Sequence, residues 1–224
     1  AEVAHHRFSA ADVVRDPLVG RIVQAYAHPT PQSGRRQAPT EAEAESEAEP
    51  EASGGATPSG TSSLTTDIAV ESAAWTERLP DVESRVERAA LAAWQAAGGA
   101  VGQDASIAIL LADDPTLADL NRRFRGIDGP TNVLSFPADR TKAQPDDETC
   151  HLGDIAIAYE TIAREAVAQE KTLDQHLAHM VVHGVLHLLD YDHQIPVDRN
   201  RMETTERTIL AGLGIPDPYD GDDG

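Results

Sequence analysis

The sequence predicts one α/β (α+β) domain, with a roughly four-stranded mixed sheet, about five flanking helices and a central buried helix that carries metal ligands. Three observations support this. Strand-like and helix-like patterns alternate from about Thr65 onwards. One helical segment is apolar almost all round, which is typical of a buried helix. A chain of 224 residues has room for one domain with appendages, and its single cysteine excludes a disulfide framework and a Cys-rich zinc site.

The expected strands are four short segments that either alternate polar and apolar residues or are continuously apolar. They cover residues 67–71, 105–112, 133–136 and 152–159. Apolar residues at helical spacing predict helices at residues 81–97, 115–124, 160–169, 172–189 and 198–212. Glycines follow the first two helices, and Asp113 or Asp114 is placed to cap the second.

Much of the negative charge lies outside this domain. The formal net charge is −20, and residues 41–51 and 217–224 together hold six Glu and four Asp with no basic residue. Such acidic blocks bury too little apolar surface to order a chain. We therefore expect an N-terminal extension at 1–65, largely a disordered acidic linker with a short helix at 9–27, an ordered domain at 66–217 and an acidic tail at 218–224.

Targeting signals are not evident in the sequence. It has no apolar run of 18 or more residues and no basic segment followed by an apolar one. We therefore expect no transmembrane helix, no secretory signal and a cytoplasmic location.

The segment from His176 to His193 contains five of the nine histidines. Successive helical residues turn by about 100°, so His183 and His187 project from one side of the predicted helix, one turn apart. His193 follows just beyond the helix, which completes the pattern HxxxHxxxxxH. Three histidine ligands leave a fourth tetrahedral position open, as catalytic zinc sites do. The spacing therefore predicts one metal ion on these three residues, with zinc, nickel or another divalent metal as candidates.

Two positions within this pattern refine the interpretation. Metzincin proteases share the spacing, but Gly184 stands where those proteases have their glutamate base. A glycine there also allows another backbone or a substrate to approach the metal. Asp190 stands where metzincins have the glycine that turns the chain, so we expect a left-handed backbone at Asp190.

The other helical histidines are open to more than one interpretation. His176 is either structural or exposed. His179 either supports a metal ligand or forms a structural hydrogen bond.

Three motifs resemble the YbeY family, the metal-dependent endoribonucleases of bacterial rRNA maturation. The residues His183-Gly-Val-Leu-His187-Leu-Leu-Asp-Tyr-Asp-His193 match HGxLHLxGYDH except at Asp190. The segments 120–126 and 130–137 resemble LNxx[YF]RG…PT[DN]VLSFP, and residues 152–155 resemble LGDI. The resemblance covers about residues 66–216.

The resemblance implies a compact α/β catalytic domain with a zinc-type ion on the three histidines. It implies cleavage of single-stranded RNA, with roles in 16S rRNA 3′-end processing and ribosome quality control, and so RNA and the ribosome or small-subunit proteins as partners. It also implies that Arg125 and His179 are catalytic. The alternatives are a metallopeptidase, and a non-catalytic ribosome-associated factor whose metal is structural.

Polar residues near these motifs have two interpretations each. Arg125 either contacts a phosphate or is a solvated arginine at a helix end. Arg122 and Arg123 either extend a positive patch or form exposed salt bridges. Asp154 and Asp192 either orient a ligand histidine or hold local backbone.

The acidic charge bears on how RNA would be bound. It excludes a broad basic RNA-binding surface but not a local phosphodiester site. We therefore expect weak affinity for free RNA, with specificity supplied by a partner such as the ribosome.

Overall fold

The structure is a computed structural model of the 224-residue chain, and it describes residues 62–98, 104–138, 149–193 and 195–220. Its sheet consists of β1 (Leu64–Val70), β2 (Asp104–Ala112), β3 (Val133–Pro137) and β4 (Thr149–Ala158). The strand order is β1-β2-β4-β3; β2 is parallel to both β1 and β4, whereas β3 is antiparallel to β4. The prediction of a four-stranded mixed sheet is confirmed.

Six helices flank the sheet in the described part of the chain. They are α2 (Ala73–Arg78), α3 (Val82–Ala96), α4 (Asp114–Arg125), α5 (Tyr159–Ala168), α6 (Leu173–Leu188) and α7 (Pro196–Gly212). Five were predicted within a few residues of these bounds. The sixth, α2, is a single short segment that the sequence pattern did not reveal, and buried Trp75 holds it by donating from Nε1 to the carbonyl of Ala112 at 3.1 Å.

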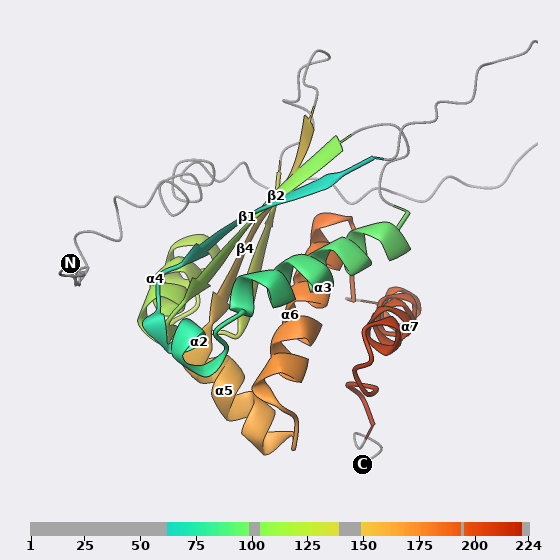
Figure 1. The fold of residues 1–224 in the computed structure, drawn as a ribbon. Helices are drawn as coiled ribbons and strands as arrows, with labels where there is room; N and C mark the ends of the chain where they lie inside the picture. Colours follow the sequence, from blue (N-terminus) through green and yellow to red (C-terminus); the bar gives the residue numbers. More distant parts are fainter. Residues whose placement is uncertain (1–61, 99–103, 139–148, 194, 221–224) are drawn as a thin grey trace, which may run out of the picture.

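Alternate residues of the central strands divide the core between the two faces of the sheet. In β2, Ile107, Ile109 and Leu111 pack with α3, α6 and α7, whereas Ala108 and Leu110 pack under α4. Figure 1 shows α3 and α6 side by side along one face, with α7 lying outside them. Helix α6 is therefore enclosed by the sheet, α3, α5 and α7.

Helix α6 is buried because its sequence is apolar on nearly every side. It begins with a capping box in which Thr172 and Gln175 exchange side-chain to backbone hydrogen bonds. Val181, Val182 and Val185 are among its fully buried residues. The prediction of a central buried helix is confirmed, and its histidines are consequently held in fixed surroundings.

Close approach of β4 to its neighbours depends on one glycine. Gly153 has φ 139°, and a Cβ there would lie 2.2 Å from the carbonyl oxygen of Phe136. The register between β2 and β4 shifts at the same point, between Ser106 and Ile107. The glycine of the LGDI segment is therefore needed for β4 to pack closely against β3.

Some predictions concern residues outside the described ranges, namely the acidic linker within 1–65 and the short helix at 9–27. Within the described residues, the helices are too short or too polar to cross a bilayer.

Candidate metal centre

The three predicted ligand histidines lie together at the end of α6. Their candidate ligand nitrogens are all within 4.8 Å of one another. His183 and His187 come from successive turns of the helix, with their Nε2 atoms 3.1 Å apart. The ring of His193 lies 5.6 Å from that of His183 and 5.0 Å from that of His187, measured between centroids. The structure therefore brings together residues that the sequence spacing selected.

A left-handed turn carries the chain from α6 to His193. Asp190 has φ 66°, which confirms the left-handed backbone expected there. The N–H of Tyr191 donates to the carbonyl of Leu186 at 3.0 Å, and that of Asp190 to His187 at 3.2 Å. These two bonds form a Schellman motif with Asp190 in the place that glycine usually takes.

Asp192 fixes the backbone immediately before the third histidine. Its Oδ1 accepts a hydrogen bond from the N–H of His193 at 2.7 Å. Of the two interpretations given for Asp192, the structure shows the local backbone bond. The turn and this bond together determine where the His193 side chain leaves the chain.

Glu206 of α7 was missed by the sequence reasoning, and it is the main support of His183. Its Oε1 accepts a hydrogen bond from Nδ1 of His183 at 2.8 Å, and the residue is 0% exposed. The hydroxyl of Tyr219, from the C-terminal segment, donates to its Oε2. Because Nδ1 of the neutral ring carries the proton, Nε2 of His183 is left as a lone-pair donor directed at His187.

The Glu206 carboxyl is kept ionised by its partners. Burial alone would raise its pKa, but interactions with His179, His183 and Tyr219 outweigh burial and lower the pKa to about 2. Burial and the bond to Glu206 in turn raise the pKa of the Tyr219 hydroxyl well above its usual range. A buried carboxylate that accepts from Nδ1 holds the His183 ring in one orientation and one tautomer, as the outer partners of ligand histidines do.

The environment of His187 favours the neutral ring that a metal requires. Burial, with the neighbouring His183 and His193 rings, lowers its pKa to about 4. A hydrogen bond with the Tyr191 backbone acts in the opposite direction, because it stabilises the protonated ring. At neutral pH, His187 is therefore uncharged and free of proton competition.

The ring geometry fits a divalent metal ion. Two nitrogens that share a tetrahedral zinc at 2.0–2.1 Å lie about 3.3 Å apart. The Nε2 atoms of His183 and His187 are 3.1 Å apart, and the Nδ1 atom of His183 is already committed to Glu206. A cation between the rings would be held by three neutral imidazoles, which leaves a coordination position for water or substrate.

The two N-terminal histidines of α6 do not join this cluster. His176 is 2% exposed, and its Nε2 lies 2.8 Å from Glu165, so the structural interpretation holds for this residue. His179 is 8% exposed, and its Nε2 lies 3.5 Å from Oε2 of Glu206 without a well-formed hydrogen bond. His179 therefore lies beside the carboxylate that supports His183.

Arg125 is connected to α6 through β3. Its guanidinium donates to the carbonyl of Ser135 at 3.2 Å, and the Ser135 hydroxyl donates to the carbonyl of Gly184 at 3.4 Å. Arg125 is exposed, so its remaining N–H groups face solvent at the edge of the sheet. Two neighbouring arginines instead form exposed ion pairs: Arg122 and Arg123 each reach a carboxylate oxygen of Asp119, at 2.7 and 2.8 Å.

The structure corrects the expectation for Gly184 and bears on the two interpretations of Asp154. A Cβ on Gly184 would lie 3.0 Å from Ile155 and 3.3 Å from the Ser135 hydroxyl. The glycine therefore admits the side chains of the sheet, and it does not open the metal to another backbone or a substrate. Asp154 is buried at 3.4 Å from Nε2 of His151, so its observed partner is not one of the three candidate ligands.

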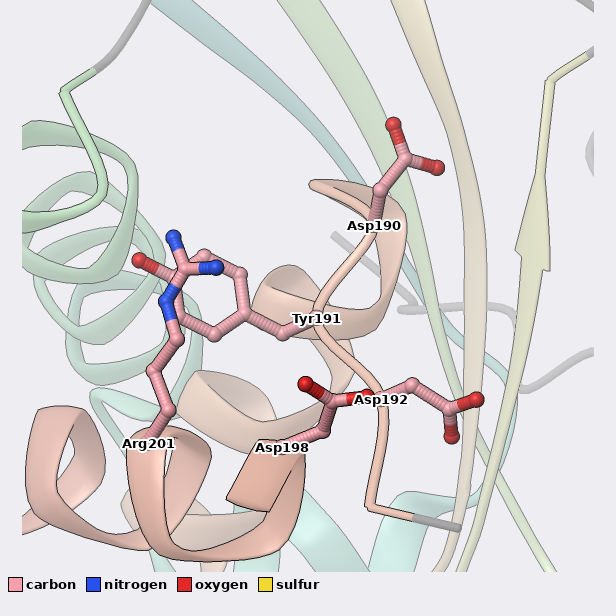
Figure 2. A pocket seen from close by; sticks show the side chains of 5 residues that line it. All are labelled: Asp190, Tyr191, Asp192, Asp198 and Arg201. Atoms are coloured by element: carbon pink, nitrogen blue, oxygen red, sulfur yellow. The ribbon is translucent and has the colours of Figure 1, made fainter. Parts of the chain in front are cut away.

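Two cavities adjoin the centre. One, of about 80 Å³, is lined by Asp190, Tyr191, Asp192, Asp198 and Arg201. Figure 2 shows the Arg201 guanidinium over the Tyr191 ring, 4.7 Å from its centroid, while the Asp190 and Asp192 carboxylates point away from each other. The second cavity, of about 170 Å³, is lined by His183 and His193 themselves, with residues of α7 and Tyr219.

A buried helix that presents two histidines, with a third on the following turn, places this protein in the class of α/β proteins with a three-histidine cluster that could hold a metal ion. The chain belongs to the YbeY family: the family model described as Endoribonuclease YbeY matches residues 72–214.

Relatives and one solved structure are similar to this chain. An Endoribonuclease YbeY of Rhodopseudomonas palustris is 47% identical over 160 residues, which cover 70% of this chain and 82% of that protein. One from a Bradyrhizobium species is 49% identical over 155 residues, covering 68% and 90%. A Thermotoga maritima protein solved in solution is 21% identical with a TM-score of 0.42, covering 71% of this chain and 99% of that chain.

Proposed function

We propose that the protein is a metal-dependent endoribonuclease that hydrolyses phosphodiester bonds in single-stranded RNA. The observation that carries this proposal is the three-histidine centre supported by Glu206, within a chain of the YbeY family. The relatives are named as endoribonucleases, which supplies the substrate class.

The metal that we propose is one zinc ion on His183, His187 and His193. Three imidazoles suit zinc, although nickel and other divalent metals accept the same ligands, and availability decides between them. When bound, such an ion acts as a Lewis acid towards a phosphoryl oxygen and lowers the pKa of a bound water towards about 7.

The protein's own groups would position the RNA and the ligands. Arg125, fixed by the Ser135 carbonyl, would place its guanidinium against a non-bridging phosphate oxygen, where charge develops during cleavage. Glu206 would hold the ring of His183 in one orientation. His179 would act through Glu206, because its Nε2 lies 3.5 Å from that carboxylate. The His179 residue itself is buried, with 8% of its surface exposed.

The metallopeptidase alternative lacks a general base. Gly184 has no side chain and packs against Ile155 and Ser135. The nearest buried carboxylate, Glu206, accepts from His183 and Tyr219 and is therefore occupied. The remaining alternative, a structural metal in a non-catalytic factor, predicts a protein that keeps its role in RNA processing when the ligands are removed.

We further propose a cytoplasmic role in maturation of the 16S rRNA 3′ end and in ribosome quality control, with rRNA and ribosomal or small-subunit components as partners. The net charge of −20 supports a partner-dependent mode of action, because it disfavours tight binding of free RNA.

The test combines elemental analysis of the purified protein with cleavage of a defined single-stranded RNA. The wild-type protein should carry about one equivalent of metal and cleave the RNA, whereas His183→Ala should lose both. His176→Gln changes a histidine of the same helix that bonds Glu165, so it should keep its metal and activity. Full metal content and activity in His183→Ala would refute the assignment.

A further inference from the structure

The larger cavity beside the metal centre has a basic residue on its rim that no motif selected. The cavity has a volume of about 170 Å³ and is lined by the candidate ligands His183 and His193, by Tyr219, and by Arg199, Met202, Glu203 and Glu206 of α7. Anything that occupies it would therefore touch two of the three ligand rings. The cavity therefore adjoins the candidate metal site and is not a remote groove.

The Arg199 side chain is held at the cavity but keeps its charge uncompensated. Its Nε donates to the carbonyl of His193 at 3.4 Å. Within the described residues no carboxylate pairs with Arg199, and its side chain is exposed. The terminal nitrogens of the guanidinium are thus available to a ligand, and the Nε bond fixes them beside the third histidine.

Two acidic residues, Glu203 and Glu206, also line the cavity, and each has partners of its own. Glu203 lies 3.5 Å from the guanidinium of Arg207, which also pairs with Asp217 at 3.1 Å. Arg199 and Arg207 are two turns apart on α7, yet only Arg207 has carboxylate partners in the described structure. Glu206 accepts hydrogen bonds from His183 and Tyr219, so among the Arg and Glu side chains that line the cavity only Arg199 lacks a side-chain partner in the described structure.

A phosphate group matches what Arg199 offers. A guanidinium binds phosphate oxygens through parallel N–H donors, which Arg199 can offer from its terminal nitrogens. Arg125 donates to the Ser135 carbonyl of β3, whereas Arg199 lines the cavity from α7, so the two guanidiniums come from different elements. In an acidic chain, separate guanidiniums of this kind would give an RNA backbone local contacts without a broad basic surface.

We propose that this cavity is a subsite for the ribonucleotide that flanks the scissile phosphodiester, and that Arg199 binds its phosphate. The proposal rests on the proposed endoribonuclease function and names a binding residue for it. It predicts an effect on RNA binding that leaves the metal ligands unchanged.

The experiment compares Arg199→Ala, Arg199→Lys and Arg201→Ala in the metal-loaded full chain. Arg201 is the matched control, because it lies on the same helix but stacks on Tyr191 in the other cavity (Figure 2). Binding is measured by fluorescence anisotropy with a labelled single-stranded 2′-O-methyl RNA over a range of salt concentrations. KM and kcat are measured with a cleavable RNA of the same sequence.

Arg199→Ala should raise the dissociation constant and KM roughly five- to tenfold while kcat and metal content stay unchanged. It should also reduce the slope of log affinity against log salt by about 1, and Arg199→Lys should retain part of the affinity. Arg201→Ala should bind as the wild type does. Equal affinity and salt slope in Arg199→Ala and Arg201→Ala would overturn the subsite.

The two proposals fail separately. If the metal-loaded wild-type protein does not cleave the RNA, the proposed function is wrong. The anisotropy measurements still test whether Arg199 binds RNA. If the wild-type protein cleaves and the Arg199 variants bind normally, the subsite alone is wrong.

Discussion

The two halves of helix α6 carry histidines of very different chemical character. In the first half, Nε2 of His176 lies 2.8 Å from the Glu165 carboxylate. In the second half, His183 meets the Glu206 carboxylate through Nδ1, also at 2.8 Å. The helix and the residue type are the same, and a carboxylate stands beside each ring.

The difference lies in which ring nitrogen the carboxylate takes. At His176 the carboxylate takes Nε2, and the remaining Nδ1 is buried without a hydrogen-bond partner in the described structure. At His183 it takes Nδ1, and Nε2 is left facing His187 at 3.1 Å. Glu165 thus occupies the nitrogen through which His176 could bind a metal, whereas Glu206 leaves the Nε2 of His183 available for one.

Removing the charge of Glu206 should give the largest change in this comparison. In Glu206→Gln the side chain keeps its volume but no longer stabilises the His183 ring as a carboxylate does. We expect metal affinity to fall about 10- to 100-fold. Competition with a chelator of known affinity measures the change, and circular dichroism checks that the fold is retained.

Glu203→Gln is the matched control for that experiment. Glu203 lies on the same helix and in the same cavity, but its partner is Arg207 rather than a histidine. Its metal affinity should equal that of the wild type. An equal loss in both variants would mean that general charge in the cavity matters and that the contact with His183 does not.

The ligand half of this site was predictable because it is local. The spacing of His183, His187 and His193 places them together once the helix forms, and the turn between them needs one left-handed residue, Asp190. Strands and helices were likewise predictable from periodic patterns within short segments.

The supporting half was not predictable, because it depends on how distant segments pack. Glu206 lies in the middle of α7, and Tyr219 lies beyond its end; nothing in their local sequence points towards α6. The contact of Gly184 with Ile155 and Ser135 similarly follows from how α6 packs on the sheet. One sequence signal was available: a glutamate on the buried side of α7 among Met202, Ile209 and Leu210 requires a partner.

Lowering the pH should destabilise the protein in part through His176, the structural histidine of this comparison. Burial lowers the pKa of His176 from its ordinary 6.5, and the bond to Glu165 only partly opposes this. Lys171 and His179, the other charged or titratable neighbours, lower it further. Below pH 6.5 the unfolded chain therefore binds a proton at His176 that the folded protein resists, so stability present above that pH is lost as pH falls.

The measurement is the free energy of unfolding in urea between pH 7.5 and 5.5, for the wild type and His176→Gln. The variant has no titrating ring at this position, so its free energy of unfolding should fall less steeply as the pH is lowered. The slopes of the two proteins should differ by at most about 1.4 kcal/mol per pH unit. Loss of metal at low pH affects both proteins alike and cancels in the comparison. Parallel pH curves would show that His176 titrates as freely when folded as when unfolded.

The smallest expected effect concerns the turn that delivers His193. Asp190 has φ 66°, a conformation that favours glycine, and the family motif has glycine there. Asp190→Gly should therefore stabilise the protein by roughly 0.5–1 kcal/mol, with unchanged metal affinity, because the two backbone bonds of the turn remain. Asp192→Gly should have the opposite sign, because Asp192 accepts from the His193 N–H at 2.7 Å. Urea unfolding of both variants measures these effects. If Asp190→Gly destabilises the protein as much as Asp192→Gly does, the side chain of Asp190 matters in this turn and its backbone angle does not.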